Sequence, residues 1–178
     1  MRLLITLDGS EFAEHAVAGM AQWVRQWKAE TWLLTVIDPD DVHSTLAGDE
    51  HRAKLPAGID TGLATRGLPI EPPIALAEDR GQALESMRIT TEEMLERVAH
   101  TYLPDEAVHV KVDFAASAPE AVAAFAAANG IDFIAMSTHG RTGVSQALLG
   151  SVATQVARRA GVPVILVGEG VPVVIQQR

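Results

Sequence analysis

The sequence contains no cysteine among its 178 residues. This absence excludes disulfide bonds, thiolate zinc sites, iron–sulfur clusters and cysteine nucleophiles. Aromatic residues are also scarce, at 4% of the chain. No run approaches the roughly 18 uncharged apolar residues that a membrane span needs. Because the acidic Asp8 comes too early for a secretory signal peptide, we expect a soluble protein of the cytoplasm.

Basic side chains are fewer than acidic ones. The chain has 14 of them against 23 acidic ones, which gives a formal net charge of −9. An acidic surface repels a phosphate backbone, so we expect no nucleic-acid partner. At about 100–200 residues per domain, the length predicts a single domain over residues 1–178.

Short apolar runs alternate with helical patterns along most of the chain. The predicted strands are Leu3–Leu7, Thr31–Ile37, Val108–Val112, Asp132–Met136 and Val164–Val167. The alternation predicts an α/β fold, a doubly wound five-stranded parallel sheet with helices on both faces. The third strand alternates apolar with polar residues, which indicates an edge, whereas the first and fourth are uninterrupted and belong in the centre. We therefore expect the strand order 3-2-1-4-5.

Two segments do not fit this pattern. Residues 38–80 have no sustained period and are interrupted by five prolines. We expect an insertion without secondary structure there, serving as a lid, a partner surface or a mobile segment. The last strand is fully apolar yet falls at an edge, so something must cover it. The apolar part of the tail 168–178, Val171–Ile175, is either exchanged with a second subunit or folded back on its own chain.

The segment from Ser137 to Ser151 carries the candidate chemistry. It is rich in Gly, Ser and Thr and leads into a predicted helix that begins near Ser151. Small residues allow main-chain N–H groups to approach a ligand, and a helix N-terminus adds donors and partial positive charge. Asp8 should face this segment across the point where the strand order reverses, the usual ligand position in such sheets. The alternatives are that the glycines only shape a turn and that Asp8 only starts a helix.

The spacing within this segment resembles that of a known family. Ser137-Thr138-His139-Gly140, nine further residues and Gly150-Ser151 follow the Gly-x2-Gly-x9-Gly-Ser/Thr motif of the ATP-binding members of the universal stress protein family, with Ser137 at the first glycine. Leu3–Glu11 and Gly150–Val167 are similar to the family's first strand and turn and to its last helix and strand. The resemblance covers about residues 1–38 and 82–167.

This resemblance implies an ATP site, occupied together with Mg²⁺. Asp8 would lie by the adenosine and Val36 in the adenine pocket, while main-chain N–H groups near Gly140 and Gly150 would hold the phosphates. Arg141 either neutralises a terminal phosphate or is solvated. The full set of candidate binding residues is Thr6, Asp8, Val36, Met136, Ser137, His139, Gly140, Arg141, Gly150, Ser151 and Val152. The resemblance also implies a homodimer through Val164–Val167, with or without the C-terminal tail.

Together these observations predict an ATP-binding stress-response or regulatory homodimer that has neither a membrane nor a nucleic acid as its partner. No evident general base, acidic metal pair or activated nucleophile is present, so we expect no catalytic residues and at most slow hydrolysis. Two alternatives stay open. One is a weak ATPase or phosphotransferase that uses Asp8 or His139, and the other is a dimerisation module that binds no nucleotide.

Overall fold

A computed structural model of the protein describes residues 1–40, 74–137, 150–168 and 172–175. These residues form one six-stranded sheet in the order β3-β2-β1-β4-β5-β6. The strands are β1 (Arg2–Thr6), β2 (Glu30–Ile37), β3 (Val108–Phe114), β4 (Phe133–Ser137), β5 (Val164–Val167) and β6 (Pro172–Ile175). The first five strands pair in parallel, which confirms the predicted order 3-2-1-4-5.

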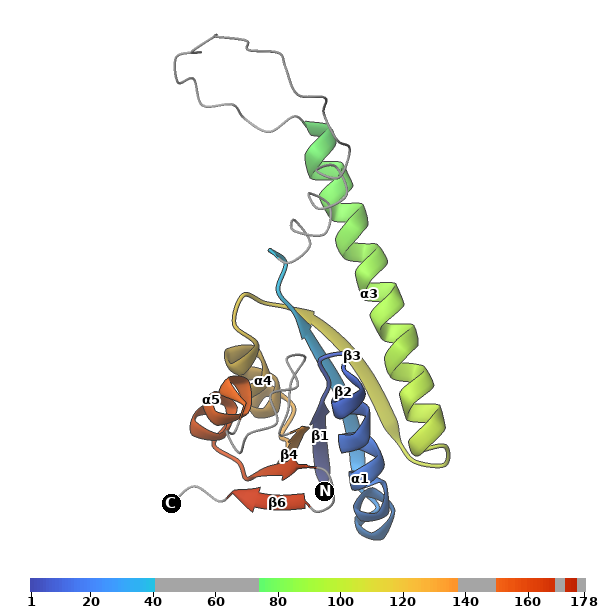
Figure 1. The fold of residues 1–178 in the computed structure, drawn as a ribbon, viewed down its shortest axis with the longest axis vertical. Helices are drawn as coiled ribbons and strands as arrows, with labels where there is room; N and C mark the ends of the chain where they lie inside the picture. Colours follow the sequence, from blue (N-terminus) through green and yellow to red (C-terminus); the bar gives the residue numbers. More distant parts are fainter. Residues whose placement is uncertain (41–73, 138–149, 169–171, 176–178) are drawn as a thin grey trace, which may run out of the picture.

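Helices cover both faces of this sheet (Figure 1). They are α1 (Glu11–Trp27), α3 (Ile74–Tyr102), α4 (Ala118–Ala128) and α5 (Ser151–Arg159). Helices α1 and α3 pack on one face, and α4 and α5 pack on the other. The first half of α3 projects beyond the sheet (Figure 1). Within the described part of the chain, no helix is long and apolar enough to cross a membrane.

The central strand β1 is apolar at consecutive positions because both of its faces are covered. Leu3 and Ile5 are fully buried under α1 and α3, while Leu4 is fully buried under α4 and α5. Strand β3 differs, since His109 and Lys111 are exposed on one face. Its alternation therefore marks an edge strand, as predicted.

The other edge of the sheet differs from the expectation. We expected β5 to be the last strand, but β6 pairs with it antiparallel, in a register that joins Val164 to Ile175 and Val167 to Pro172. The tail therefore folds back on its own chain and satisfies the backbone groups that β5 would otherwise expose.

Helix α1 approaches β5 very closely at Gly19. A Cβ atom at this position would lie 2.8 Å from Cγ1 of Val167. Only glycine fits such a separation without movement of a neighbour. The contact holds the middle of α1 against the end of β5.

One expectation about the middle of the chain was wrong. Helix α3 begins at Ile74, within the stretch 38–80 that we expected to lack secondary structure. Ser117 is the N-cap of α4, and its side chain makes no capping hydrogen bond. The buried stripe of α1 includes Val17 and Val24, whereas Trp23 is 39% exposed.

Candidate functional site

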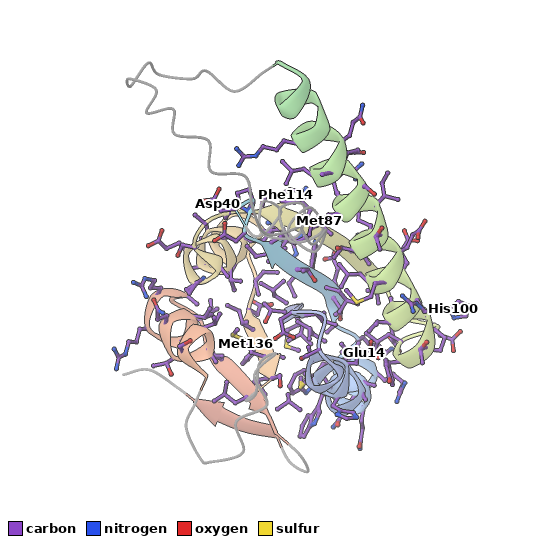
Figure 2. All side chains as sticks on the ribbon, turned by 45° about the horizontal axis from the view of Figure 1, so that its top comes forward. Glu14, Asp40, Met87, His100, Phe114 and Met136 are labelled. Atoms are coloured by element: carbon purple, nitrogen blue, oxygen red, sulfur yellow. The ribbon has the colours of Figure 1, made fainter. Side chains whose placement is uncertain are left out.

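The strand order reverses between β1 and β4, and both strands end at the same edge of the sheet. Thr6 is paired with Met136 near these ends, and Figure 2 shows Met136 on β4 near the middle of the molecule. The helices that follow the two strands lie on opposite faces of the sheet, α1 on one and α5 on the other. This geometry opens a crevice beyond the strand ends, which is where ligands of doubly wound sheets bind.

A cavity of about 220 Å³ lies at this edge. It brings together residues that are far apart in the sequence, from β1, β2, β4 and the starts of three helices. Its lining consists of Thr6, Leu7, Asp8, Ala13, Leu34, Val36, Ala118, Val122, Met136, Ser137, Gly150, Ser151, Val152 and Ala153. Eight of the eleven candidate residues are in this set. The other three, His139, Gly140 and Arg141, lie outside the described residues.

Asp8 lines the cavity and also organises the start of α1. Its Oδ1 accepts a hydrogen bond from the main-chain N–H of Ser10 at 3.0 Å and another from the Ser10 hydroxyl at 2.6 Å. The Ser10 oxygen in turn accepts from the N–H of Ala13 at 3.2 Å, as an N-cap does. The structural role that we weighed for Asp8 is therefore present, and the same carboxylate borders the cavity.

Val36 offers main-chain groups to the cavity. The N–H of Leu7 donates to the carbonyl of Leu34 at 2.9 Å, so the peptide groups of Leu34 face β1. The N–H of Ala115 donates to the carbonyl of Ile37 at 3.0 Å, so those of Ile37 face β3. Because successive residues of a strand direct these groups to alternate sides, Val36 directs its N–H and C=O toward β1, past that strand's end. A donor and an acceptor thus stand next to each other at the cavity wall.

Three helices begin around the cavity, and their first turns differ in charge and capping. Helix α5 starts with Gly150 as N-cap, has no side-chain cap and carries no acidic residue in its first turn. Helix α1 is capped by Ser10, and α4 carries Glu120 in its first turn. A negative charge there offsets the partial positive charge of a helix N-terminus. The start of α5 is therefore the end of the cavity best suited to an anion.

The first turn of α5 is also accessible. Ser151 is exposed, and the apolar Val152 is 40% exposed although it lines the cavity. The Thr154 hydroxyl of this turn donates a hydrogen bond to the carbonyl of Gly150 at 3.1 Å. The main-chain N–H groups at the start of α5 are thus placed beside open volume.

Sequence reasoning missed the wall that α4 contributes. Ala118 and Val122 line the cavity, and Val122 packs in the same buried cluster as Leu34. The topology contained the signal for this wall. A helix that connects edge strand β3 to β4 must start at the carboxyl edge and cross β2 and β1 on its way, so its first turns had to overlie the crevice.

Outside the cavity, α3 carries a network of ion pairs around Arg88. On α3, the Arg88 guanidinium hydrogen-bonds the exposed carboxylate of Glu85 and holds its pKa below the usual range. The two carboxylates Glu85 and Glu92 raise the pKa of Arg88 in return. Among the described residues, no group of three or more His, Asp or Glu side chains is arranged to hold a metal ion.

Comparison with known proteins agrees with this architecture. Residues 63–168 match the model of the universal stress protein family. The chain belongs to the universal stress protein family. No curated protein sequence matches the chain significantly.

Solved structures of other universal stress proteins share the fold. UspA from Lactobacillus plantarum superposes with a TM-score of 0.65 at 14% identity, over 94% of this chain and 97% of that protein. A family member from Burkholderia pseudomallei gives 0.51 at 19% identity, over 93% and 94% of the two chains. A universal stress protein solved in complex with cAMP gives 0.50 at 18% identity, over 94% and 95%. At these identities the likeness establishes the fold alone.

The range that matches the family model includes some of the residues that line the cavity and not others. The segment from Ser137 to Ser151 and helix α5 fall inside the matched range. Thr6, Asp8 and Val36 precede it, and they reach the cavity through the shared fold. The match begins at residue 63, so it also includes part of the stretch for which we expected no counterpart in this family.

Proposed function

We propose that this universal stress protein binds an adenine nucleotide, foremost ATP, and acts as a cytoplasmic stress-response or regulatory module rather than as an enzyme. One observation carries the proposal. Eight candidate residues from four separate segments line a single cavity at the reversal of strand order. A family member of the same fold was solved in complex with cAMP, which supports an adenine nucleotide as the ligand class.

The two ends of the cavity fit the two ends of a nucleotide. The main-chain N–H and C=O that Val36 directs past the end of β1 offer a donor and an acceptor to the edge of a base. Asp8 is placed to accept a hydrogen bond from a ribose hydroxyl, which an ionised carboxylate does well. The N–H groups at the start of α5 would hold the phosphates.

Magnesium would enter with the nucleotide. Mg²⁺ binds phosphate oxygens and keeps several of its own waters, so it does not require a protein cage. The Ser151 hydroxyl at the start of α5 is exposed beside the cavity and is the described group best placed to reach the phosphates or their hydrated ion. Asp8, the one carboxylate among the described lining residues, already accepts two hydrogen bonds from Ser10. We therefore expect slow hydrolysis at most.

The test is direct ligand identification. Purified protein would be denatured and the released small molecules identified by mass spectrometry, and the ligand-free protein would then be titrated with ATP and Mg²⁺ by calorimetry. We expect an adenine nucleotide and saturable binding. A purified protein that releases no nucleotide, and that shows neither a heat of binding nor a thermal shift when ATP and Mg²⁺ are added, would contradict the proposal. This result would favour a nucleotide-independent interaction module. Steady turnover that is abolished in Asp8→Asn would favour a slow ATPase.

We also propose that two copies associate at the β5–β6 end of the sheet. Both strands are apolar throughout, and β6 is the outermost strand that the structure describes. Exchange of β6 between two copies would preserve the pairing of Val164–Val167 with the tail. Light scattering on the full chain should give the mass of a dimer. A shortened chain that ends at residue 168 lacks β6 and should give a different assembly mass. A monomer at all concentrations would contradict the proposal.

A further inference from the structure

The first turns of α4 form a side of the cavity that the phosphate-loop motif does not include. Ala118 is half-buried and Val122 is 2% exposed, and both line the cavity. On the strand side, Leu34 and Val36 line it as well. Leu34 is 1% exposed and packs in the same buried cluster as Val122. This half of the cavity therefore presents methyl groups on two sides.

The charged and hydrogen-bonding groups at the start of α4 favour an uncharged group in this half of the cavity. Pro119 has no N–H, which removes one donor from the first turn of α4, and Glu120 adds a negative charge there. A phosphate placed at this helix would meet fewer donors and a repelling carboxylate. Helix α5 begins without an acidic residue, so the anionic end of a ligand is favoured at α5 and its apolar end at α4.

We propose that Ala118 and Val122 form the wall that packs against the base, and that the small side chain of Ala118 determines how large a base the cavity admits. This inference rests on the proposed function and adds a specificity determinant to it. The base faces are apolar and flat, so they gain by contact with methyl groups. Ala118 lines the cavity, so each methyl group added to its side chain would occupy volume that is open to the base.

The experiment enlarges this side chain in two steps and separates the base from the phosphates. Ala118→Val and Ala118→Leu would be compared with the wild type in calorimetric titrations with ATP and with inorganic tripolyphosphate. Because one methylene in an apolar pocket changes affinity by about 10–200-fold, we expect ATP affinity to fall at least about tenfold in Ala118→Leu and less in Ala118→Val. Tripolyphosphate affinity should stay unchanged in both variants.

Ala124→Leu is the matched control. Ala124 lies on the same helix, is exposed and is absent from the cavity lining, so the same substitution there should leave ATP affinity unchanged. Thermal melting would verify that the variants are folded. If Ala118→Leu fails to fold, Ala118→Val carries the test alone.

The outcomes distinguish this inference from the proposed function. If the wild type binds ATP and Ala118→Val or a folded Ala118→Leu binds it equally well, the wall does not face the base and the inference is wrong. Equal losses of ATP and tripolyphosphate affinity would also refute it, because the substitution would then act on the whole site. If the wild type binds neither ligand, the proposed function itself fails.

Discussion

Replacing Gly19 by alanine tests the close approach of α1 to β5. The new Cβ would lie 2.8 Å from Cγ1 of Val167, closer than two carbon atoms can approach. Val167 is 5% exposed, and its β-branched side chain has few rotamers available. Relief therefore requires a shift of α1 away from β5.

The expected energy is a difference of two opposing effects. Overpacking of a well-packed core costs about 1–3 kcal/mol. Alanine in place of glycine within a helix contributes about 1 kcal/mol of stability. We therefore expect Gly19→Ala to change the free energy of unfolding by between about 0 and −2 kcal/mol, measured by urea denaturation.

The chain offers a matched control for the stability that alanine adds when it replaces glycine within a helix. Gly81 lies inside α3, and a Cβ there would meet nothing within 4 Å. Gly81→Ala should therefore stabilise the protein by about 1 kcal/mol. Adding Val167→Ala to Gly19→Ala should remove the clash, which a double-mutant cycle would show as a favourable coupling of about 0.5–3 kcal/mol. If Gly19→Ala stabilises the protein as much as Gly81→Ala does, the reasoning from this contact is wrong.

Two further predictions concern the cavity. Asp8→Asn keeps a side-chain oxygen that can accept the hydrogen bonds from Ser10, so the free energy of unfolding should change by less than about 0.5 kcal/mol. Asp8→Ala removes these hydrogen bonds and should lower the free energy of unfolding by about 1–2 kcal/mol. Both should weaken ATP binding in calorimetry if the carboxylate faces the ribose, and an unaltered affinity in Asp8→Asn would restrict Asp8 to its structural role. Val152→Asp places an acid in the first turn of α5, which should raise stability by about 0.3–1 kcal/mol while it abolishes ATP binding by repelling the phosphates. Unchanged ATP binding in this exposed variant would show that the phosphates lie elsewhere.

The sheet was predictable because the residue pattern that identifies each strand lies within the strand itself. The two central strands β1 and β4 each contain at least three consecutive apolar residues, and the alternation at His109 and Lys111 identified the edge. Ser10 caps α1, and such a cap depends only on residues that are neighbours in the sequence. The position of Asp8 at the cavity followed from the rule that ligands bind where the strand order reverses.

Features that depend on tertiary contacts were harder to predict. The four-residue strand β6 is too short to show a period, so the sequence left open whether the tail pairs with its own chain. The apolar residues of α1 alone do not fix how the helix is rotated, and the structure buries Val24 while Trp23 is 39% exposed. Ala118 has no chemical signal of its own, and only the crossing of α4 over the sheet places it at the cavity.

The antiparallel course of β6 determines where the chain ends relative to the cavity. Ile175 pairs with Val164, the first residue of β5, so the described chain returns to the amino edge of the sheet. Met1 lies at that same edge, where its carbonyl accepts a hydrogen bond from the N–H of Glu30. An affinity tag, a fluorophore or a surface tether attached at either end would therefore leave the opening of the cavity unobstructed.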